Sequence, residues 1–171
     1  AMMVTLCTVL LVGVEAGVIA GVTATISLIL WRTSRPHTAI VGPVEGGEQF
    51  RNIDRHLVKQ VKQVLVLRID ESLFFGNLRY LDNRINGLLA SHPAMEHLVL
   101  MASGINHIDS SALQSLLELN TRLDDKGIKM HFSDVKGPVL DRLQRINFAD
   151  ELTGTVYLSQ HQAWQDLTQL Y

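Results

Sequence analysis

The sequence has only one cysteine among its 171 residues, Cys7, which lies in the most apolar part of the chain. A single cysteine excludes an internal disulfide and a cysteine-rich zinc site. The seven histidines are scattered, and none has the short paired spacing that is typical of metal ligands. We therefore expect neither a bound metal nor a cofactor.

The motifs of common enzyme classes are missing as well. Gly46-Gly47 is not followed by Lys and Ser or Thr, and it lacks the strand-to-helix context of a phosphate-binding loop. No serine stands in a nucleophile elbow, and the adjacent carboxylates of Asp124-Asp125 are interpreted as a solvated helix end. The sequence predicts that the protein is not an enzyme.

Charge is almost absent from the first 31 residues, in which Glu15 is the only acidic or basic side chain. All 15 lysines and arginines follow Trp31. This distribution predicts a membrane segment, residues 1–31, joined to a soluble domain. The net charge of −2 and the pI of about 6.4 give no basic field that would attract nucleic acid, so no nucleic-acid partner is expected.

The apolar run is longer than one membrane-spanning helix requires. At ~1.5 Å per residue it would reach about 46 Å, against a hydrocarbon core of ~30 Å. Either one helix tilts strongly, or the run breaks near Gly13 to Gly17 into two shorter helices. Gly13, Gly17 and Gly21 have the spacing that lets membrane helices approach closely. A chain that begins inside a membrane segment is expected to be a fragment of a longer protein.

Trp31, Arg32 and Arg35 end the apolar run with an aromatic ring at the interface and cations beyond it. By the positive-inside rule the residues that follow are cytoplasmic, which predicts an integral membrane protein with a cytoplasmic domain. Residues 32–47 are rich in glycine and proline and are predicted to be a linker that enters a first strand, 39–41, at a sheet edge.

The rest of the chain alternates between short apolar runs and amphipathic stretches. The longer runs predict strands at 64–70, 97–103 and 129–135, and a short apolar run at 156–158 precedes the last helix. The amphipathic stretches predict helices from about Asn77 to 91, over 108–123, from Gly137 through Ile146, and over a last segment with Ala163, Trp164, Leu167 and Leu170 on its buried face. Such alternation predicts a small α/β domain with a mainly parallel sheet.

The segment around the second of these strands carries the candidate site. Asp109 is the predicted N-cap of the following helix, which leaves the hydroxyls of Ser110 and Ser111 at the positive end of the helix dipole. The buried stripe of this helix is predicted to consist of Leu113, Leu116, Leu117, Asn120 and Leu123. No base neighbours the serines in sequence, so the turn suits a regulatory or partner-binding site better than an active site. Alternatively, the three residues only cap the helix.

Several blocks in order resemble the SulP family of anion transporters, also called the sulfate permease or solute carrier 26 family. The blocks are Pro36-His37, Val41-Gly42, Gly46-Gly47 and Phe50-Arg51-Asn52, then Arg68-Ile69-Asp70 with Leu73-Phe74-Phe75-Gly76-Asn77, and finally Ile108-Asp109-Ser110-Ser111-Ala112-Leu113. The last two blocks resemble the family's cytoplasmic STAS domain. In this family an alanine more usually stands at the position of Gly76.

The resemblance implies that the chain is the C-terminal part of a secondary active, sulfate-type anion transporter. Residues 1–31 would be one or two short terminal transmembrane helices. Residues 36–171 would be a STAS domain with about four strands in a mainly parallel sheet flanked by helices, serving regulation, assembly or partner binding. The family's anion site is built by earlier membrane helices, so no residue here is assigned to substrate. Expected partners are the membrane, the upstream transmembrane domain, a second copy in a homodimer, and a regulatory protein at the STAS loop.

A rival interpretation comes from the other branch of the STAS group, the anti-sigma factor antagonists. In those soluble regulators a serine at the position of Ser111 is phosphorylated by a partner kinase, and the next residue is glycine. Here that residue is Ala112. In this rival interpretation the domain is a protein-binding module switched by phosphorylation.

Overall fold

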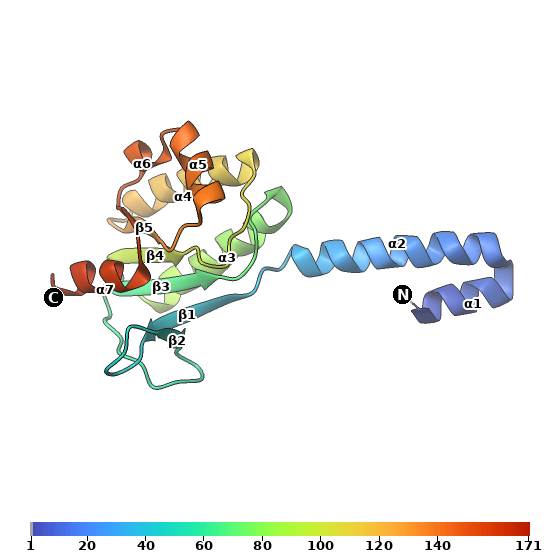
Figure 1. Ribbon diagram of the computed structural model, residues 1–171, viewed down its shortest axis with the longest axis horizontal. Coiled ribbons are helices and arrows are strands. Elements are labelled where there is room, and N and C mark those ends of the chain that lie inside the picture. The colour runs from blue at the N-terminus through green and yellow to red at the C-terminus, as the bar shows by residue number, and fades with distance from the viewer. Residues whose placement is uncertain (1) are drawn as a thin grey trace. The chain divides into compact units, whose positions relative to one another are not determined.

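The computed structural model describes residues 2–171, which divide into two compact units (Figure 1). The first unit ends at Arg35 and consists of helices α1, Met2–Val12, and α2, Val14–Thr33. Ala1 lies outside the described residues. The second unit is Pro36–Tyr171. Within residues 2–171, α2 is the one helix long and apolar enough to cross a membrane, and α1 is a shorter apolar helix.

The apolar run breaks at Gly13, so of the two arrangements that the sequence left open the structure has the one with two helices. Gly13 adopts φ 122°, a conformation that glycine reaches without a steric penalty. Gly17 and Gly21 are buried against α1, where an added Cβ would meet the side chains of Val9 and Thr5. The spaced glycines therefore let α1 and α2 pack closely against each other.

The second unit is built on a six-stranded sheet with the order β2-β1-β3-β4-β5-β6. Its strands are β1, Thr38–Pro43; β2, Phe50–Asn52; β3, Val64–Ile69; β4, His97–Met101; β5, Lys129–Ser133; and β6, Val156–Tyr157. Strands β3 to β6 are parallel, and β1 and β2 are antiparallel to their neighbours. The predicted α/β fold with a mainly parallel sheet is confirmed. Two short strands, β2 and β6, extend the sheet beyond the four that were expected.

Strand β1 is not the edge strand that the sequence suggested. Its residues Thr38–Ile40 pair with β3, and its residues Val41–Pro43 pair with β2, which forms the edge. β1 therefore separates from β3 after Ile40.

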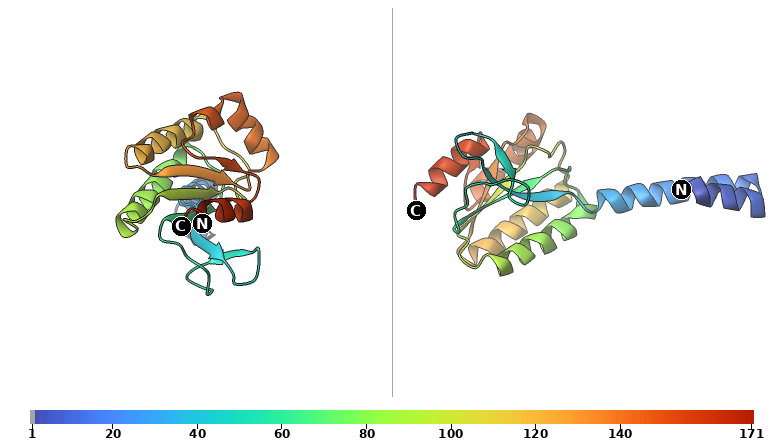
Figure 2. Two further views of the ribbon diagram at one scale, coloured as in Figure 1. Left: turned by 90° about the vertical axis from the view of Figure 1, so that its left-hand side faces the viewer. Right: turned by 90° about the horizontal axis from the view of Figure 1, so that it is seen from below.

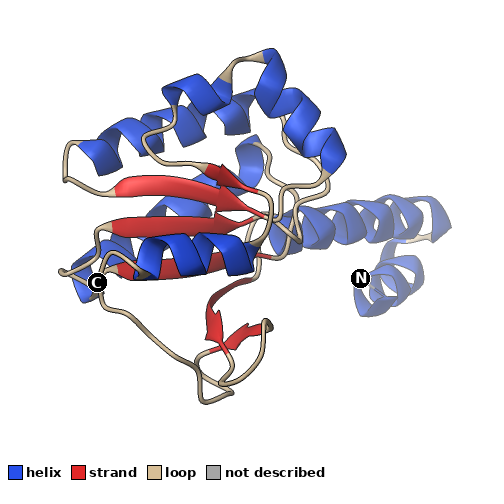
Figure 3. Cartoon of the chain, turned by 60° about the vertical axis from the view of Figure 1, so that its left-hand side comes forward, coloured by secondary structure: helices blue, strands red, loops and turns tan. Residues whose placement is uncertain are grey.

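Helices cover both faces of this sheet (Figures 2 and 3). The helices are α3, Phe75–Ser91; α4, Ser110–Asp124; α5, Gly137–Arg145; α6, Phe148–Glu151; and α7, Gln160–Thr168. Alternation along β3 sends Leu65 and Leu67 into the large core with α3 to α6, and Val64 and Val66 into a smaller core with α7. The sheet is thus the middle layer of three.

The buried face of α4 differs in one position from the predicted stripe. Leu117 is only partly buried, whereas Leu119 is buried beside Leu116. Asn120, the polar member, is satisfied because its side-chain amide donates to the carbonyl of Glu151 at 2.9 Å and its oxygen accepts from the amide N–H of Thr153 at 3.1 Å. It thereby holds the segment after α6 against α4.

Three further expectations about segment ends are corrected. The strand predicted over 129–135 ends at Ser133, because Asp134 adopts φ 52° and leaves the extended conformation. The helix predicted through Ile146 ends at Arg145, and Ile146 is 40% exposed. Leu170 was predicted on a buried helix face, but it is 64% exposed. Ile146 is the C-cap of α5 and Leu170 follows the end of α7, so neither lies within a packed helical turn.

Candidate functional site

The N-termini of α3 and α4 lie side by side, beyond the C-terminal ends of the parallel strands β3 and β4. We call this side of the sheet the sheet edge. The loops before the two helices are joined by backbone hydrogen bonds, with Leu73 donating to the carbonyl of His107 at 3.0 Å and Asp109 donating to the carbonyl of Leu73 at 3.1 Å. A parallel bridge between Leu73 and Ile108 continues this pairing. The first residues of β1 lie at the same edge, because Thr38 is opposite Ile69, the last residue of β3.

Asp109 connects the two helix starts. Its Oδ1 accepts from the backbone N–H of Ala112 at 2.7 Å, so the predicted N-cap of α4 is confirmed. Its Oδ2 accepts from the backbone N–H of Phe75, the first residue of α3, at 3.1 Å. One carboxylate therefore satisfies free N–H groups of two helices. The second contact joins residues 34 positions apart and has no local sequence signal.

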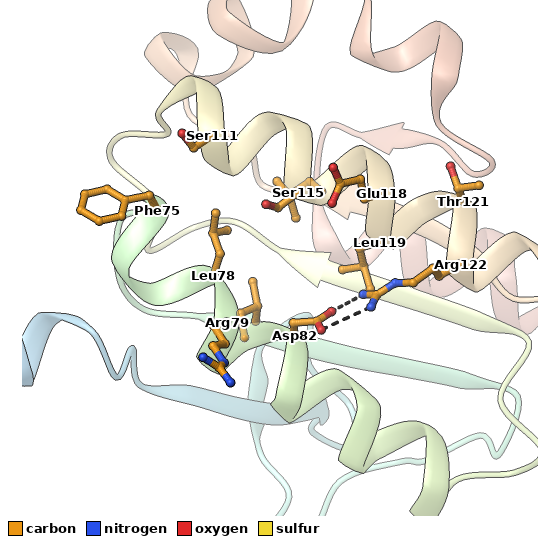
Figure 4. A pocket seen from close by; sticks show the side chains of 12 residues that line it. Phe75, Leu78, Arg79, Asp82, Ser111, Ser115, Glu118, Leu119, Thr121 and Arg122 are labelled. Carbon is orange, nitrogen blue, oxygen red and sulfur yellow. Dashed lines mark hydrogen bonds and ion pairs between the residues drawn. The ribbon is translucent and has the colours of Figure 1, made fainter.

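Ser110 and Ser111 are exposed at the start of α4. Ser111 lines a groove of about 640 Å³ between α3 and α4, and Phe75 lines the same end of the groove (Figure 4). Phe75 is 76% exposed, an unusual position for a large aromatic side chain. The structure thus adds an aromatic residue to the predicted turn, which sequence analysis missed because adjacent phenylalanines give no sign of which one faces solvent.

The far end of the groove is closed by an ion pair. Two guanidinium nitrogens of Arg122 on α4 contact both carboxylate oxygens of Asp82 on α3 (Figure 4). The hydrogen bond to Asp82 raises the pKa of Arg122 above its ordinary value. The groove therefore combines an apolar floor, which includes Leu78 and Leu119, with polar sides. Such a surface suits protein contact.

A second polar cluster lies at the same sheet edge, around Asp70. Arg68 donates to both carboxylate oxygens of Asp70, at 2.7 and 3.1 Å, and His37 Nδ1 lies 2.6 Å from Oδ2. Burial alone would raise the pKa of Asp70, but the hydrogen bonds from Arg68 and His37 outweigh it and hold the pKa below its ordinary value. The backbone N–H of Asp70 also donates to the carbonyl of His37 at 3.0 Å, which fixes the start of the second unit on β3.

Two buried histidines form a separate pair on the α7 face of the sheet. His131 Nδ1 accepts from the backbone N–H of Thr155 at 3.0 Å, so its proton is on Nε2, which donates to His97 Nδ1 at 3.0 Å. Burial lowers the pKa of His131 to about 4, with the nearby His97 and Lys129 adding to the effect. Burial likewise lowers the pKa of His97. Both imidazoles are therefore neutral at pH 7. Within residues 2–171 no group of three His, Cys, Asp or Glu side chains is arranged to hold a metal ion.

Comparison with known proteins identifies the family of this domain. A family model described as "STAS domain" matches residues 56–163, which include β3 to β6 and the candidate turn. Sulfate transporter 1.3 of Arabidopsis thaliana is 29% identical over 152 residues, covering 83% of this chain and 23% of that protein. The chain spans about a quarter of the length of the curated relatives that it matches.

Two solved structures share the fold. The murine Solute Carrier 26 family member A9 anion transporter in its inward-facing state matches with a TM-score of 0.84 at 15% identity, covering 98% of this chain and 28% of that one. A sulfate transporter family protein from Wolinella succinogenes matches with a TM-score of 0.53 at 20% identity, covering 69% of this chain and 95% of that one. At such identities the likeness concerns the fold.

Proposed function

Because the chain belongs to the STAS domain family, we propose that it is the C-terminal part of a secondary active, sulfate-type anion transporter of the SulP family. The observation that carries this proposal is the match to a sulfate transporter, which extends over 83% of the chain and so reaches beyond the 56–163 segment of the STAS domain. The proposed role of the second unit is regulation, assembly or partner binding.

The proposed setting is a membrane protein with its STAS unit in the cytoplasm. Helix α2 has the length of a membrane span, and Trp31 and Arg35 stand at its C-terminal end. The guanidinium of Arg35 lies 5.0 Å from the centroid of the Trp31 ring, an arrangement that suits a membrane interface. In the whole protein we further expect a homodimer. Substrate binding is assigned to membrane helices outside this chain.

Transport by the full-length protein tests the proposal. The full-length gene is expressed in a host strain that lacks its own sulfate uptake, and uptake of radiolabelled sulfate is measured with unlabelled bicarbonate, dicarboxylates and chloride as competitors. We expect uptake above the empty-vector level and competition by the anion that is carried. A protein that reaches the membrane and takes up no labelled sulfate would refute the sulfate-type proposal.

We assign the regulatory contact to the turn formed by Asp109, Ser110 and Ser111. The turn is held by the core through β4 and by the hydrogen bonds to the loop before α3, while both serine side chains are exposed. It also shares its sheet edge with the first residues of the second unit. A rigid, polar, accessible turn beside the point where the domain begins is suited to contact a regulator or the transporter's own membrane domain.

A phosphate on Ser111 would be tolerated by this geometry. It would bring about −1.5 to −2 charges to the start of a 15-residue helix, where the dipole favours negative charge. Asp109 opposes it by like-charge repulsion, and the two effects are of similar size. The phosphate would thus leave α4 intact and act on the surface of a partner.

The second candidate function is the phosphorylation-switched binding module of the anti-sigma factor antagonist type. The observation that favours it is the exposed hydroxyl of Ser111 at a helix start. Mass spectrometry of the protein purified from its own cells separates the two. Stoichiometric phosphate on Ser111 without anion transport supports the module, whereas transport without phosphate supports the transporter.

A further inference from the structure

A second cavity, of about 410 Å³, opens where β1 separates from β3. β1 pairs with β3 only over Thr38–Ile40, so the first half of β3, Val64–Val66, has no β1 residue beside it. The gap is bordered instead by residues 59–62, which precede β3, and by residues 91–94, which follow α3. The volume lies within the range of about 300–1,000 Å³ that small-molecule sites occupy.

The inner walls of this cavity are apolar. They include Ile40 of β1, Val61 and Leu65 beside the open edge of β3, and Trp164 of α7. The Trp164 ring is packed edge-to-face against Phe50, with 6.1 Å between the ring centroids. Three separate segments therefore supply a preformed surface for an apolar group.

The rim of the cavity is cationic. Lys59 and Lys62 line it and are exposed, and neither forms an ion pair within the part of the chain that the structure describes. None of the described residues that line the cavity is acidic. Glu96, the acidic residue next in sequence to this wall, accepts a hydrogen bond from the Tyr171 hydroxyl at 2.7 Å instead. An anionic group at the rim would thus meet two unpaired ammonium groups and no carboxylate of the lining.

We propose that this cavity binds a small amphipathic anion, a carboxylate attached to a short alkyl chain. The alkyl part would contact the walls around Trp164, and the carboxylate would lie between Lys59 and Lys62. Burial of apolar surface supplies affinity, and the lysines select the charge. This site is distinct from the Asp109–Ser111 turn and does not depend on the proposed transport function.

The fluorescence of Trp164 offers a direct test. The chain has two tryptophans, so the substitution Trp31→Phe leaves Trp164 as the only one. The full chain with this substitution is placed in phosphatidylcholine nanodiscs and titrated with octanoate, with 1-octanol and octylamine as neutral and cationic controls. We expect a saturable change in Trp164 emission with octanoate. 1-Octanol should bind about tenfold more weakly, because it cannot form the two ion pairs, each of which contributes a factor of about two to five to the affinity.

Substitutions separate the two halves of the proposed site. Lys59→Gln and Lys62→Gln should each weaken octanoate binding about two- to fivefold and leave 1-octanol binding unchanged. The control is Lys126→Gln, at an exposed lysine in the turn after α4, which should change the binding of neither ligand. Ala94→Phe places a ring at the mouth of the cavity and should weaken the binding of both octanoate and 1-octanol. Because Ala94 is exposed, we expect the fold to tolerate this change. Equal affinity for octanoate and octylamine, lysine variants that bind like the parent, or a signal that never saturates would overturn the proposal.

Discussion

Asp109 has a structural role at the candidate site whatever partner the turn binds. Its two carboxylate oxygens accept from N–H groups at the starts of two helices, and those N–H groups would lose this partner if the side chain were removed. Ser110 and Ser111 make no comparable contact with the core and are exposed. Stability and regulation are thus assigned to different residues of one turn.

Removal of the Asp109 carboxylate should lower stability measurably. We expect Asp109→Ala to reduce the free energy of unfolding of the second unit by about 2 kcal/mol, the sum of a lost N-cap and a lost hydrogen bond to α3. Ser110→Ala, the matched control, should change it by no more than about 0.5 kcal/mol. Denaturant unfolding of both variants measures the difference, and equal values would mean that Asp109 does not connect the helices.

The buried pair of His97 and His131 makes stability depend on pH. In the unfolded chain His131 has an ordinary pKa of 6.5, and in the folded protein its pKa is about 4. Between these values the unfolded state binds a proton that the folded state does not, so stability should fall as pH decreases from about 6.5 to about 4 and should be unaffected by this residue above that window.

Comparison with a histidine outside the core tests this dependence. Unfolding midpoints are measured from pH 7.5 to 4.5 for the parent, for His131→Gln and for His92→Gln, a residue at the end of α3 that is only partly buried. The slope of stability against pH should become shallower in His131→Gln only. A parent slope that survives this substitution would place the sensitivity elsewhere.

At the scale of elements, α4 is the helix on which the large core and the candidate site both depend. Leu116→Asp places a carboxylate at a side chain that is 1% exposed, which costs several kcal/mol, and should unfold the second unit. Gln114→Asp, two residues earlier on the exposed side of the same helix, should leave the fold intact. Circular dichroism melts distinguish the outcomes, and similar melting of both variants would show that the buried face is misassigned.

The loop after β4 crosses closely over the end of β3 at Gly104. A Cβ built on Gly104 would lie 2.6 Å from the Cα of Asp70, closer than real contacts allow, and the obstacle is backbone. We expect Gly104→Ala to destabilise the second unit by about 1–3 kcal/mol. Gly87→Ala is the control, because no atom lies within 4 Å of an added Cβ there and alanine favours the helix. A melting temperature unchanged by Gly104→Ala would contradict the close crossing.

The sequence predicted the elements better than their contacts. Periodicity identified β3, β4, β5 and most of the buried residues of α4, because strand and helix repeats depend on neighbours along the chain. It did not reveal β2 or the departure of β1 from β3, since both follow from pairing between distant residues. The same limit applies to the site. The N-cap of Asp109 is local and was predicted, whereas its bond to Phe75 and the groove of Ser111 need two helices in place.

On the scale of the whole molecule, the two units should behave independently. The first unit exposes most of its large apolar side chains, while the second buries two cores of its own. We expect the full chain to require detergent or lipid, and a chain shortened to residues 36–171 to be soluble and to unfold cooperatively. Size-exclusion chromatography and a thermal melt test this. Aggregation of residues 36–171, or a melt without a transition, would contradict the boundary at Arg35.

Sulfate uptake by the full-length protein with substitutions at Ser111 tests most directly whether the chain belongs to a transporter that this turn regulates. Parent, Ser111→Glu and Ser111→Ala are compared at matched amounts in the membrane, with Gln114→Ala as a control on the same helix. We predict uptake by the parent and no change in the control. For Ser111→Glu we predict an initial rate that differs from the parent's by about fivefold or more, the lower end of typical coupling between sites. Equal uptake by all four proteins would contradict the regulatory role of the turn, and no uptake by the parent would contradict the transporter itself.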